Sequence, residues 1–119
     1  MTPQPSADAA LLVHMRDCID RIAEYTALDR QRFDASRLVQ DAVIRNLQTL
    51  AESSQRLSDA AKAAEPGIPW RKLAGFRNVL VHGYLGVDLQ AVWSVVEQDL
   101  PALAAAVKRM ASAAAASPP

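Results

Sequence analysis

Residues 89 to 107 read LQAVWSVVEQDLPALAAAV, and this stretch decides the class of fold. Its large apolar side chains recur every three or four positions, at Leu89, Val92, Trp93, Val96, Leu100, Leu103 and Val107. This spacing places them on one face of an α-helix, which has 3.6 residues per turn. Asp88 is the expected N-cap of this helix. Pro101 cannot donate a hydrogen bond to the carbonyl of Glu97, so we expect it to kink the helix.

Three further segments with helical periodicity precede this one, and they cover residues 7–28, 35–63 and 69–82. Ser6 is the expected N-cap of the first helix. The charged segment Asp29–Asp34 interrupts the pattern and is predicted to be a turn. Pro66 and Gly67 should end the second helix, and Gly83 is the expected left-handed stop of the third. Four amphipathic helices with short links favour an up-and-down bundle.

The chain has 119 residues, which suffices for one domain with a modest core. We predict that this domain covers residues 7–111. Residues 1–6 and 112–119 are rich in Pro, Ser and Ala, and we expect them to be flexible tails. The chain has four glycines and no alternation of β-branched residues, which argues against a sheet protein. The sequence therefore predicts an all-α protein.

Composition also limits the classes of function. Lys plus Arg and Asp plus Glu number 13 each, so the chain as a whole does not attract nucleic acid over long distances. The single cysteine, Cys18, cannot form an intrachain disulfide, and its apolar helical surroundings favour burial. One Cys and two His cannot supply four metal ligands without carboxylates, and we predict neither a metal nor a cofactor. No apolar run is long enough to span a membrane, so we expect a cytoplasmic protein.

Between residues 66 and 87 the chain contains no acidic residue. The cations of this window are Arg71, Lys72, Arg77 and His82, and the aromatic residues between them are Trp70, Phe76 and Tyr84. A local positive patch attracts phosphates, and aromatic faces can stack bases. We therefore predict that Arg71 and Lys72 bind RNA. The alternative is that Trp70 and Phe76 belong to the core and that the charges form a solvated face.

Residues 77 to 84 read RNVLVHGY and gather side chains that suit RNA cleavage by transesterification. His82 could take the proton from a 2′-hydroxyl or protonate the leaving oxygen. Arg77 could bind the phosphate and stabilise the charge that builds on it. Asn78 could orient His82 or the phosphate, and Tyr84 could add a hydrogen bond or a stacking face. These roles need no metal.

Helical geometry separates two of these residues. Asn78 and His82 are one turn apart and share a face. Arg77 and His82 point in directions about 140° apart, because each residue turns the helix by about 100°. They can converge if the helix ends near His82, if Arg77 wraps round, or if two copies of the helix line one groove in a two-fold dimer. The plain alternative is a capped helix end, where the dipole alone favours a histidine.

The motif resembles the Arg-x4-His-x-Tyr signature of the HepT toxins, which belong to the HEPN superfamily of helical, metal-independent ribonucleases. The resemblance covers roughly residues 11 to 107. Four segments carry it besides Arg77–Tyr84: residues 68–78 (IPWRKLAGFRN), 86–93 (GVDLQAVW), 99–101 (DLP) and 40–47 (QDAVIRNL). One departure lies at residues 50–53, where the family has Ile-Gly-Glu-Ala. Glu52 is kept there, but Ala51 replaces the glycine, and a Cβ atom at this position limits how closely another helix can approach.

The resemblance implies a HEPN-type four- to five-helix bundle that forms a homodimer with its cleft at the interface. It implies that Arg77 and His82 are the catalytic pair, with Asn78 as their polar neighbour. The partner would be a MntA-type nucleotidyltransferase antitoxin, which transfers AMP to the motif tyrosine, here Tyr84. A bulky anion at this position would block RNA and neutralise the patch.

Three functions are therefore in competition. The first is a toxin ribonuclease of a type VII toxin–antitoxin system. The second is a non-catalytic HEPN module that docks a nucleotidyltransferase or binds a nucleotide through the same patch. The third is a purely structural helical dimer. The combination of Arg77, Asn78, His82 and Tyr84 favours the enzyme, because a scaffold does not need all four.

Overall fold

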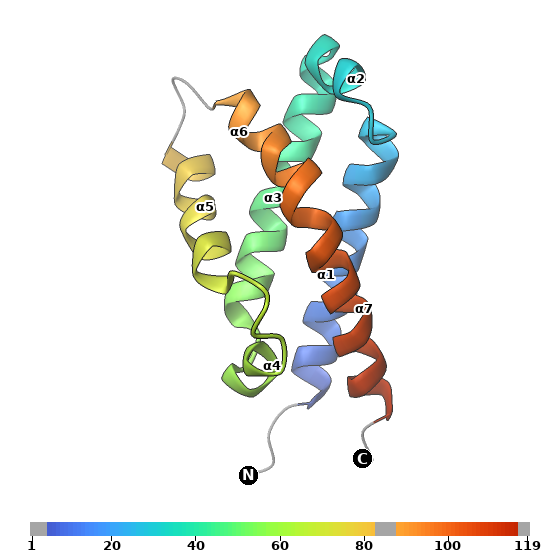
Figure 1. Ribbon diagram of the computed structural model, residues 1–119, viewed down its shortest axis with the longest axis vertical. Coiled ribbons are helices and arrows are strands. Elements are labelled where there is room, and N and C mark those ends of the chain that lie inside the picture. The colour runs from blue at the N-terminus through green and yellow to red at the C-terminus, as the bar shows by residue number, and fades with distance from the viewer. Residues whose placement is uncertain (1–4, 83–87, 117–119) are drawn as a thin grey trace.

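Helices make up the bundle, and short capped turns connect them (Figure 1). The computed structural model describes residues 5–82 and 88–116. Its elements are α1 (Pro5–Thr26), α2 (Arg30–Ala35), α3 (Arg37–Arg56), α4 (Asp59–Ala63), α5 (Trp70–His82), α6 (Leu89–Ser94), the π-helical turn η1 (Val95–Asp99) and α7 (Leu100–Ala116). The described ranges contain no strand, which confirms the predicted all-α bundle.

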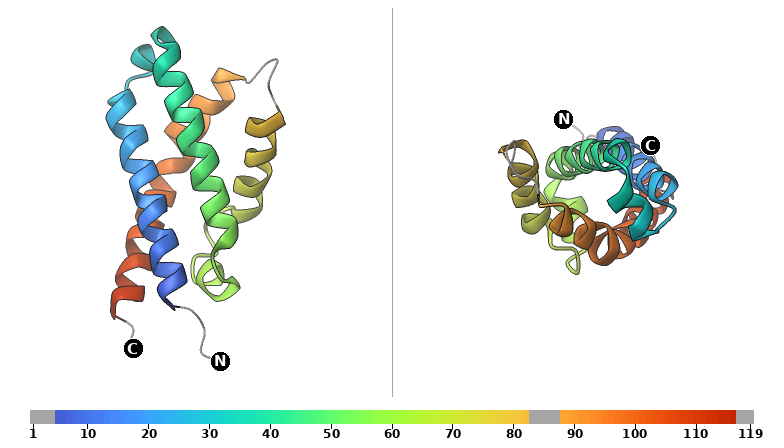
Figure 2. Two further views of the ribbon diagram at one scale, coloured as in Figure 1. Left: turned by 180° about the vertical axis from the view of Figure 1, so that it is seen from behind. Right: turned by 90° about the horizontal axis from the view of Figure 1, so that it is seen from above.

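The long helices α1, α3 and α7 surround the core, and α5 packs on the outside of α3 (Figures 1 and 2). The core gathers apolar side chains from every long element and includes Leu12, Met15, Ile22, Phe33, Val43, Leu47, Leu50, Trp93, Leu103 and Val107. Cys18 is buried among them as expected, and burial raises the pKa of its thiol. Within the described residues, no helix has the length and apolarity that crossing a membrane requires.

The charged segment after α1 forms a short helix, so the predicted turn at Asp29–Asp34 is wrong. Asp29 caps this helix, α2, because its carboxylate accepts a hydrogen bond of 2.9 Å from the N–H of Gln31. Phe33 is fully buried, and its ring centre lies 5.4 Å from that of Trp93 in α6. The buried indole N–H of Trp93 has no acceptor within the described part of the chain, so this ring contributes through packing.

The single helix predicted over residues 35–63 is divided by two serine caps. The hydroxyl of Ser36 accepts from the N–H of Val39 at 3.1 Å and starts α3. The hydroxyl of Ser58 accepts from the N–H of Ala61 at 3.1 Å and starts α4. Serine at such positions offers the backbone an alternative to the helical hydrogen bond, which explains both breaks.

The helix predicted from Asp88 onward is present, and Asp88 caps it as expected. Its irregularity before Pro101 takes the form of η1, in which the N–H of Leu100 bonds to the carbonyl of Val95, five residues earlier. The helices also extend into both segments that were expected to be tails. Helix α1 begins at Pro5, so Ser6 lies inside it and is not its N-cap, and α7 continues to Ala116.

The turn between α1 and α2 holds two residues in the left-handed region, Ala27 with φ of 51° and Leu28 with φ of 58°. Thr26 stabilises this turn from inside the core. Its hydroxyl donates to the carbonyl of Ile22 at 2.9 Å and accepts from the N–H of Leu28 at 3.1 Å. Left-handed backbone is costly for a residue with a Cβ atom. Leu28 is therefore a strained position whose side chain is 73% exposed.

Replacing Leu28 by glycine should raise the free energy of unfolding by about 0.5 to 1 kcal/mol, because the relief of strain exceeds the added entropy of the unfolded chain. Urea denaturation would measure this change. Leu38→Gly is the matched control, since Leu38 is 80% exposed but lies in α3, where glycine should lower stability. A lower free energy of unfolding for Leu28→Gly would show that the backbone at Leu28 is not strained.

Candidate functional site

Helix α5 carries three of the four predicted motif residues, Arg77, Asn78 and His82, in its C-terminal half. The predicted extent of this helix, to His82, is confirmed. The fourth residue, Tyr84, and the expected stop at Gly83 lie outside the described residues. The helix is regular through position 82, so positions 77 and 82 keep their angular separation of about 140°. The C-terminal end of α5 lies toward the end of the bundle where α2 and α6 are found (Figure 1).

The other end of α5 is fixed by its first residue. The indole N–H of Trp70 donates to the carbonyls of Lys62 at 3.0 Å and of Glu65 at 3.1 Å. Ile68 and Leu73 on either side of this residue are buried in the core. Trp70 itself is half-buried, so one part of its ring packs and another remains accessible. The alternative that placed Trp70 and Phe76 in the core is thus correct in part, because both are half-buried.

The two residues predicted to bind RNA have different surroundings. Lys72 forms an ion pair of 3.1 Å with Asp99 and so connects α5 to η1. Arg71 is exposed and lines a groove of about 500 Å³ between α3, α4 and α5. The groove is lined by Ser54, Gln55, Lys62, Trp70, Arg71 and Ala74. Arg71 is therefore the better placed of the two cations to receive a ligand.

A hydrogen bond sets the register between α3 and α5. The side-chain amide of Gln55 donates to the carbonyl of Ala74 at 3.4 Å, and the two helices run antiparallel (Figure 1). One helical turn farther along each helix, Glu52 comes opposite positions 77 and 78. Sequence reasoning noted Glu52 only as part of a family pattern. The register of the two helices therefore puts position 52 at about the level of positions 77 and 78.

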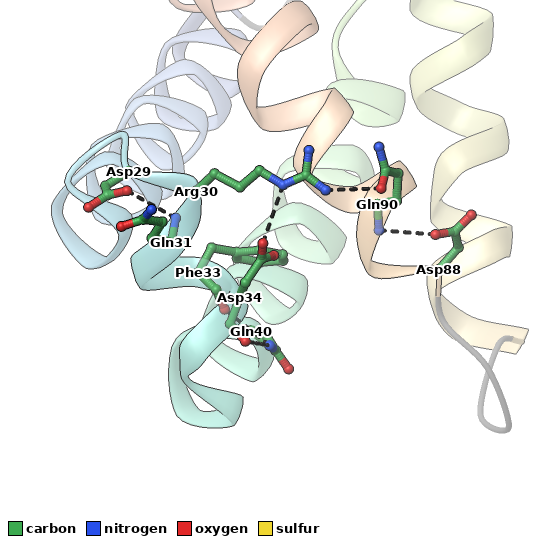
Figure 3. A network of polar contacts seen from close by, with 8 residues as sticks. All are labelled: Asp29, Arg30, Gln31, Phe33, Asp34, Gln40, Asp88 and Gln90. Atoms are coloured by element: carbon green, nitrogen blue, oxygen red, sulfur yellow. Dashed lines mark hydrogen bonds and ion pairs between the residues drawn. The ribbon is translucent and has the colours of Figure 1, made fainter.

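A polar network fixes the start of α6, the first helix after residues 83–87 in the sequence (Figure 3). The carboxylate of Asp88 accepts from the N–H groups of Gln90 at 3.0 Å and Ala91 at 3.3 Å. The guanidinium of Arg30 in α2 donates to the side-chain oxygen of Gln90 at 2.9 Å and to Asp34 at 3.3 Å. Helix α2 therefore supports the N-terminal end of α6.

Glu65, beside Trp70, is neutralised by a residue of α7. A guanidinium nitrogen of Arg109 lies 2.7 Å from its carboxylate, and this hydrogen bond lowers the pKa of Glu65. The ion pair balances the charge of this carboxylate. It also connects the segment before α5 to α7.

Replacing Arg109 by methionine should lower stability at neutral pH and have a smaller effect in acid. A carboxylate whose pKa is depressed by folding stabilises the protein above its unfolded pKa, and this contribution is lost as the pH falls through the folded pKa. The difference between parent and variant should therefore shrink below pH 4.5, the ordinary pKa of this group. Thermal unfolding from pH 3 to 7 would measure it. In a Glu65→Gln background the effect of Arg109→Met should no longer depend on pH, and persistence of that dependence would contradict the assignment.

The described residues bring no three His, Cys, Asp or Glu side chains together in a cluster that could hold a metal ion. The expectation of cleavage without a metal thus stays a prediction.

Comparison with known proteins decides the family. The family model described as Ribonuclease HepT-like matches residues 15–110, from the middle of α1 to the last third of α7. The chain belongs to the HepT-like ribonuclease family. The match includes all of α5, and it confirms the resemblance that the motif suggested. No solved structure matches the chain significantly.

Individual relatives agree with membership of the HepT-like family. A Thermococcus cleftensis protein named probable ribonuclease HepT is 36% identical over 93 residues, which cover 77% of this chain and 84% of that protein. A Methanocaldococcus jannaschii protein named as a candidate RNase is 30% identical over 93 residues, covering 77% and 85%. A similarly named protein of Caldanaerobacter subterraneus is 25% identical over 109 residues, covering 92% and 94%.

Proposed function

We propose that this HepT-like ribonuclease is the cytoplasmic toxin of a type VII toxin–antitoxin system, a metal-independent endoribonuclease. The observation that carries the proposal is the complete set of Arg77, Asn78 and His82 on a regular helix of a chain that belongs to this family. A purely structural dimer does not need these three residues. A docking module needs the positive charge of Arg77 but not the imidazole of His82.

In the proposed reaction His82 takes the proton from the 2′-hydroxyl of the substrate, or gives a proton to the leaving 5′-oxygen. The 2′-oxygen forms a bond to phosphorus while the bond from phosphorus to the 5′-oxygen breaks. Arg77 binds the phosphate and stabilises the negative charge that builds on it. Asn78 orients the imidazole or the phosphate. Glu52, opposite Arg77 in the register of α3 and α5, can orient the guanidinium.

A homodimer would allow Arg77 and His82 to act at one site although they point in different directions on a single helix. Arg77 and His82 diverge on one straight helix, so a site that uses both is easier to build from two copies. Two α5 helices related by a two-fold axis would place the arginine of one protomer near the histidine of the other. They would also double the positive charge available to the RNA.

Tyr84 is the proposed site of regulation. A MntA-type nucleotidyltransferase would transfer AMP from ATP to its hydroxyl with release of pyrophosphate. The added phosphate and nucleoside would compete with RNA for Arg77 and His82 by charge and by volume.

Two measurements test the proposal. The purified protein should cut single-stranded RNA in the presence of EDTA. After co-expression with the nucleotidyltransferase, intact mass should rise in units of AMP, and Tyr84→Phe should abolish the gain. A mass gain without cleavage under any condition would favour the non-catalytic docking module. Absence of both would leave only the structural dimer.

A further inference from the structure

The groove between α3, α4 and α5 lies outside the motif and has the chemistry of a nucleotide site. Its floor and walls combine one aromatic ring, two cations and two polar side chains, contributed by Trp70, Lys62, Arg71, Ser54 and Gln55. Its volume of about 500 Å³ falls within the range of pockets that hold small ligands, roughly 300 to 1,000 Å³.

Both charged residues that line the groove are cations. Neither Lys62 nor Arg71 forms an ion pair with a carboxylate in the described ranges 5–82 and 88–116. The carboxylate of Glu65, three residues after Lys62 in the chain, is held by Arg109 at 2.7 Å. Lys72, adjacent in sequence to Arg71, is instead occupied by Asp99. Lys72 is thus paired with a carboxylate, whereas Lys62 and Arg71 are available to bind an anion.

Trp70 gives the groove an ordered aromatic wall. Its indole N–H is shared between the carbonyls of Lys62 and Glu65, so the orientation of the ring is fixed before any ligand arrives. The ring is half-buried and lines the groove. A ring fixed in this way loses little conformational freedom when a base stacks on it, which favours binding.

The groove lies on the side of α5 that leads to the motif. Positions 71, 74, 78 and 82 recur on one side of a helix of 3.6 residues per turn. Arg71 and Ala74 line the groove, and Gly75 leaves the neighbouring surface open, with no atom within 4 Å of an added Cβ. The rise from position 71 to 82 is about 16 Å at 1.5 Å per residue. A single strand that follows α5 would cover this distance with a few nucleotides.

We propose that this groove binds one nucleotide of the single-stranded RNA substrate, a few nucleotides from the phosphate that is cut. Arg71 and Lys62 would contact the phosphate, and the base would stack on Trp70. The inference rests on the proposed function for the identity of the ligand. It adds a binding site that makes recognition depend on the length of the RNA.

Binding is tested with a fluorescein-labelled ten-nucleotide oligouridylate and full-length protein carrying His82→Ala, which prevents cleavage. In this background Arg71→Ala should weaken binding about tenfold, as expected for loss of one charge-assisted contact. The slope of log affinity against log salt should fall by about 0.7 per lost cation. Arg71→Lys should recover part of the affinity. Lys108→Ala, an exposed cation of α7, is the matched control for net charge and should bind like the parent.

Tryptophan fluorescence gives a second readout. The chain has two tryptophans, and Trp93 is only 4% exposed, so quenching by the unlabelled oligonucleotide should come from Trp70. We expect quenching in the His82→Ala protein and its loss when Trp70→Phe is added. Equal affinity of the Arg71→Ala and parent proteins, or emission unchanged by RNA, would overturn the inference.

Cleavage distinguishes this inference from the proposed function. Arg71→Ala should raise the KM for a ten-nucleotide substrate and leave the cleavage of a dinucleotide unchanged, because a dinucleotide cannot reach the groove. If the parent cuts RNA and Arg71→Ala cuts both substrates as well as the parent does, the proposal for the groove is wrong and the proposed function stands. If the parent never cuts RNA but Arg71→Ala still weakens binding, the groove is correct and the catalytic function is wrong.

Discussion

Replacing His82 by alanine should lower the rate of RNA cleavage by a factor of about 10² to 10⁴, the usual contribution of a general acid or base. Arg77→Ala should cause a loss of similar size, because no other group of the motif can neutralise the phosphate as charge builds on it. Initial rates with a labelled single-stranded RNA in EDTA measure both effects. Toxicity on expression in a bacterial host should disappear in parallel.

The chain supplies a matched control for this prediction. Its only other histidine, His14, is exposed on α1, away from α5 in the bundle. His14→Ala should cut RNA at the parental rate. Circular dichroism of all variants should show the same helix content, so that a loss of activity cannot be assigned to unfolding. Full activity in both His82→Ala and Arg77→Ala would show that the catalytic roles proposed for these residues are wrong.

Mixing the two inactive variants tests whether the site is shared between protomers. If Arg77 of one protomer works with His82 of the other, a heterodimer of Arg77→Ala and His82→Ala contains one site with both residues intact. Activity should then return on mixing and refolding. If each protomer contains its own site, every site in the heterodimer lacks one residue and activity should not return. The outcome decides between a catalytic site shared by two protomers and a catalytic site on a single chain.

The sequence predicts the elements whose signals are local. The period of apolar residues defines the long helices, and Asp88 is visible as a cap because its partners are the next residues along the chain. The motif is equally visible, since all its members lie between residues 77 and 84. Helix α2 was missed because six residues are too few to show a period and Phe33 is its only buried residue. Its charged neighbours resemble a turn.

The features that sequence did not predict depend on contacts between distant residues. The pair of Lys72 with Asp99 joins residues 27 apart, and the pair of Glu65 with Arg109 joins residues 44 apart. No pattern in the chain distinguishes Arg71 from Lys72, yet tertiary structure gives them different surroundings. The groove likewise exists only because α3, α4 and α5 meet, and the position of Glu52 opposite the motif follows from the register of two helices.

Replacing Phe33 by alanine should lower the free energy of unfolding by about 3 to 5 kcal/mol, the usual cost of removing a buried aromatic ring. Phe33 is fully buried and packs against Trp93, so its removal leaves a cavity between α2 and α6. A domain of this size is stable by only about 5 to 15 kcal/mol, so the variant should be close to unfolding at moderate temperature. Urea denaturation measures the change. Leu38→Ala is the control, because that side chain is 80% exposed and should lose little.

The same variant tests whether α2 supports the motif or only the core. Helix α2 meets α6 through the Phe33–Trp93 contact and through the hydrogen bond from Arg30 to Gln90. Loss of the first contact should loosen the start of α6, which immediately follows the segment that carries Tyr84. We therefore expect Phe33→Ala to reduce cleavage per folded molecule, whereas Phe33→Leu, which keeps most of the volume, should retain it. Loss of stability with unchanged cleavage per folded molecule would show that α2 serves the core alone.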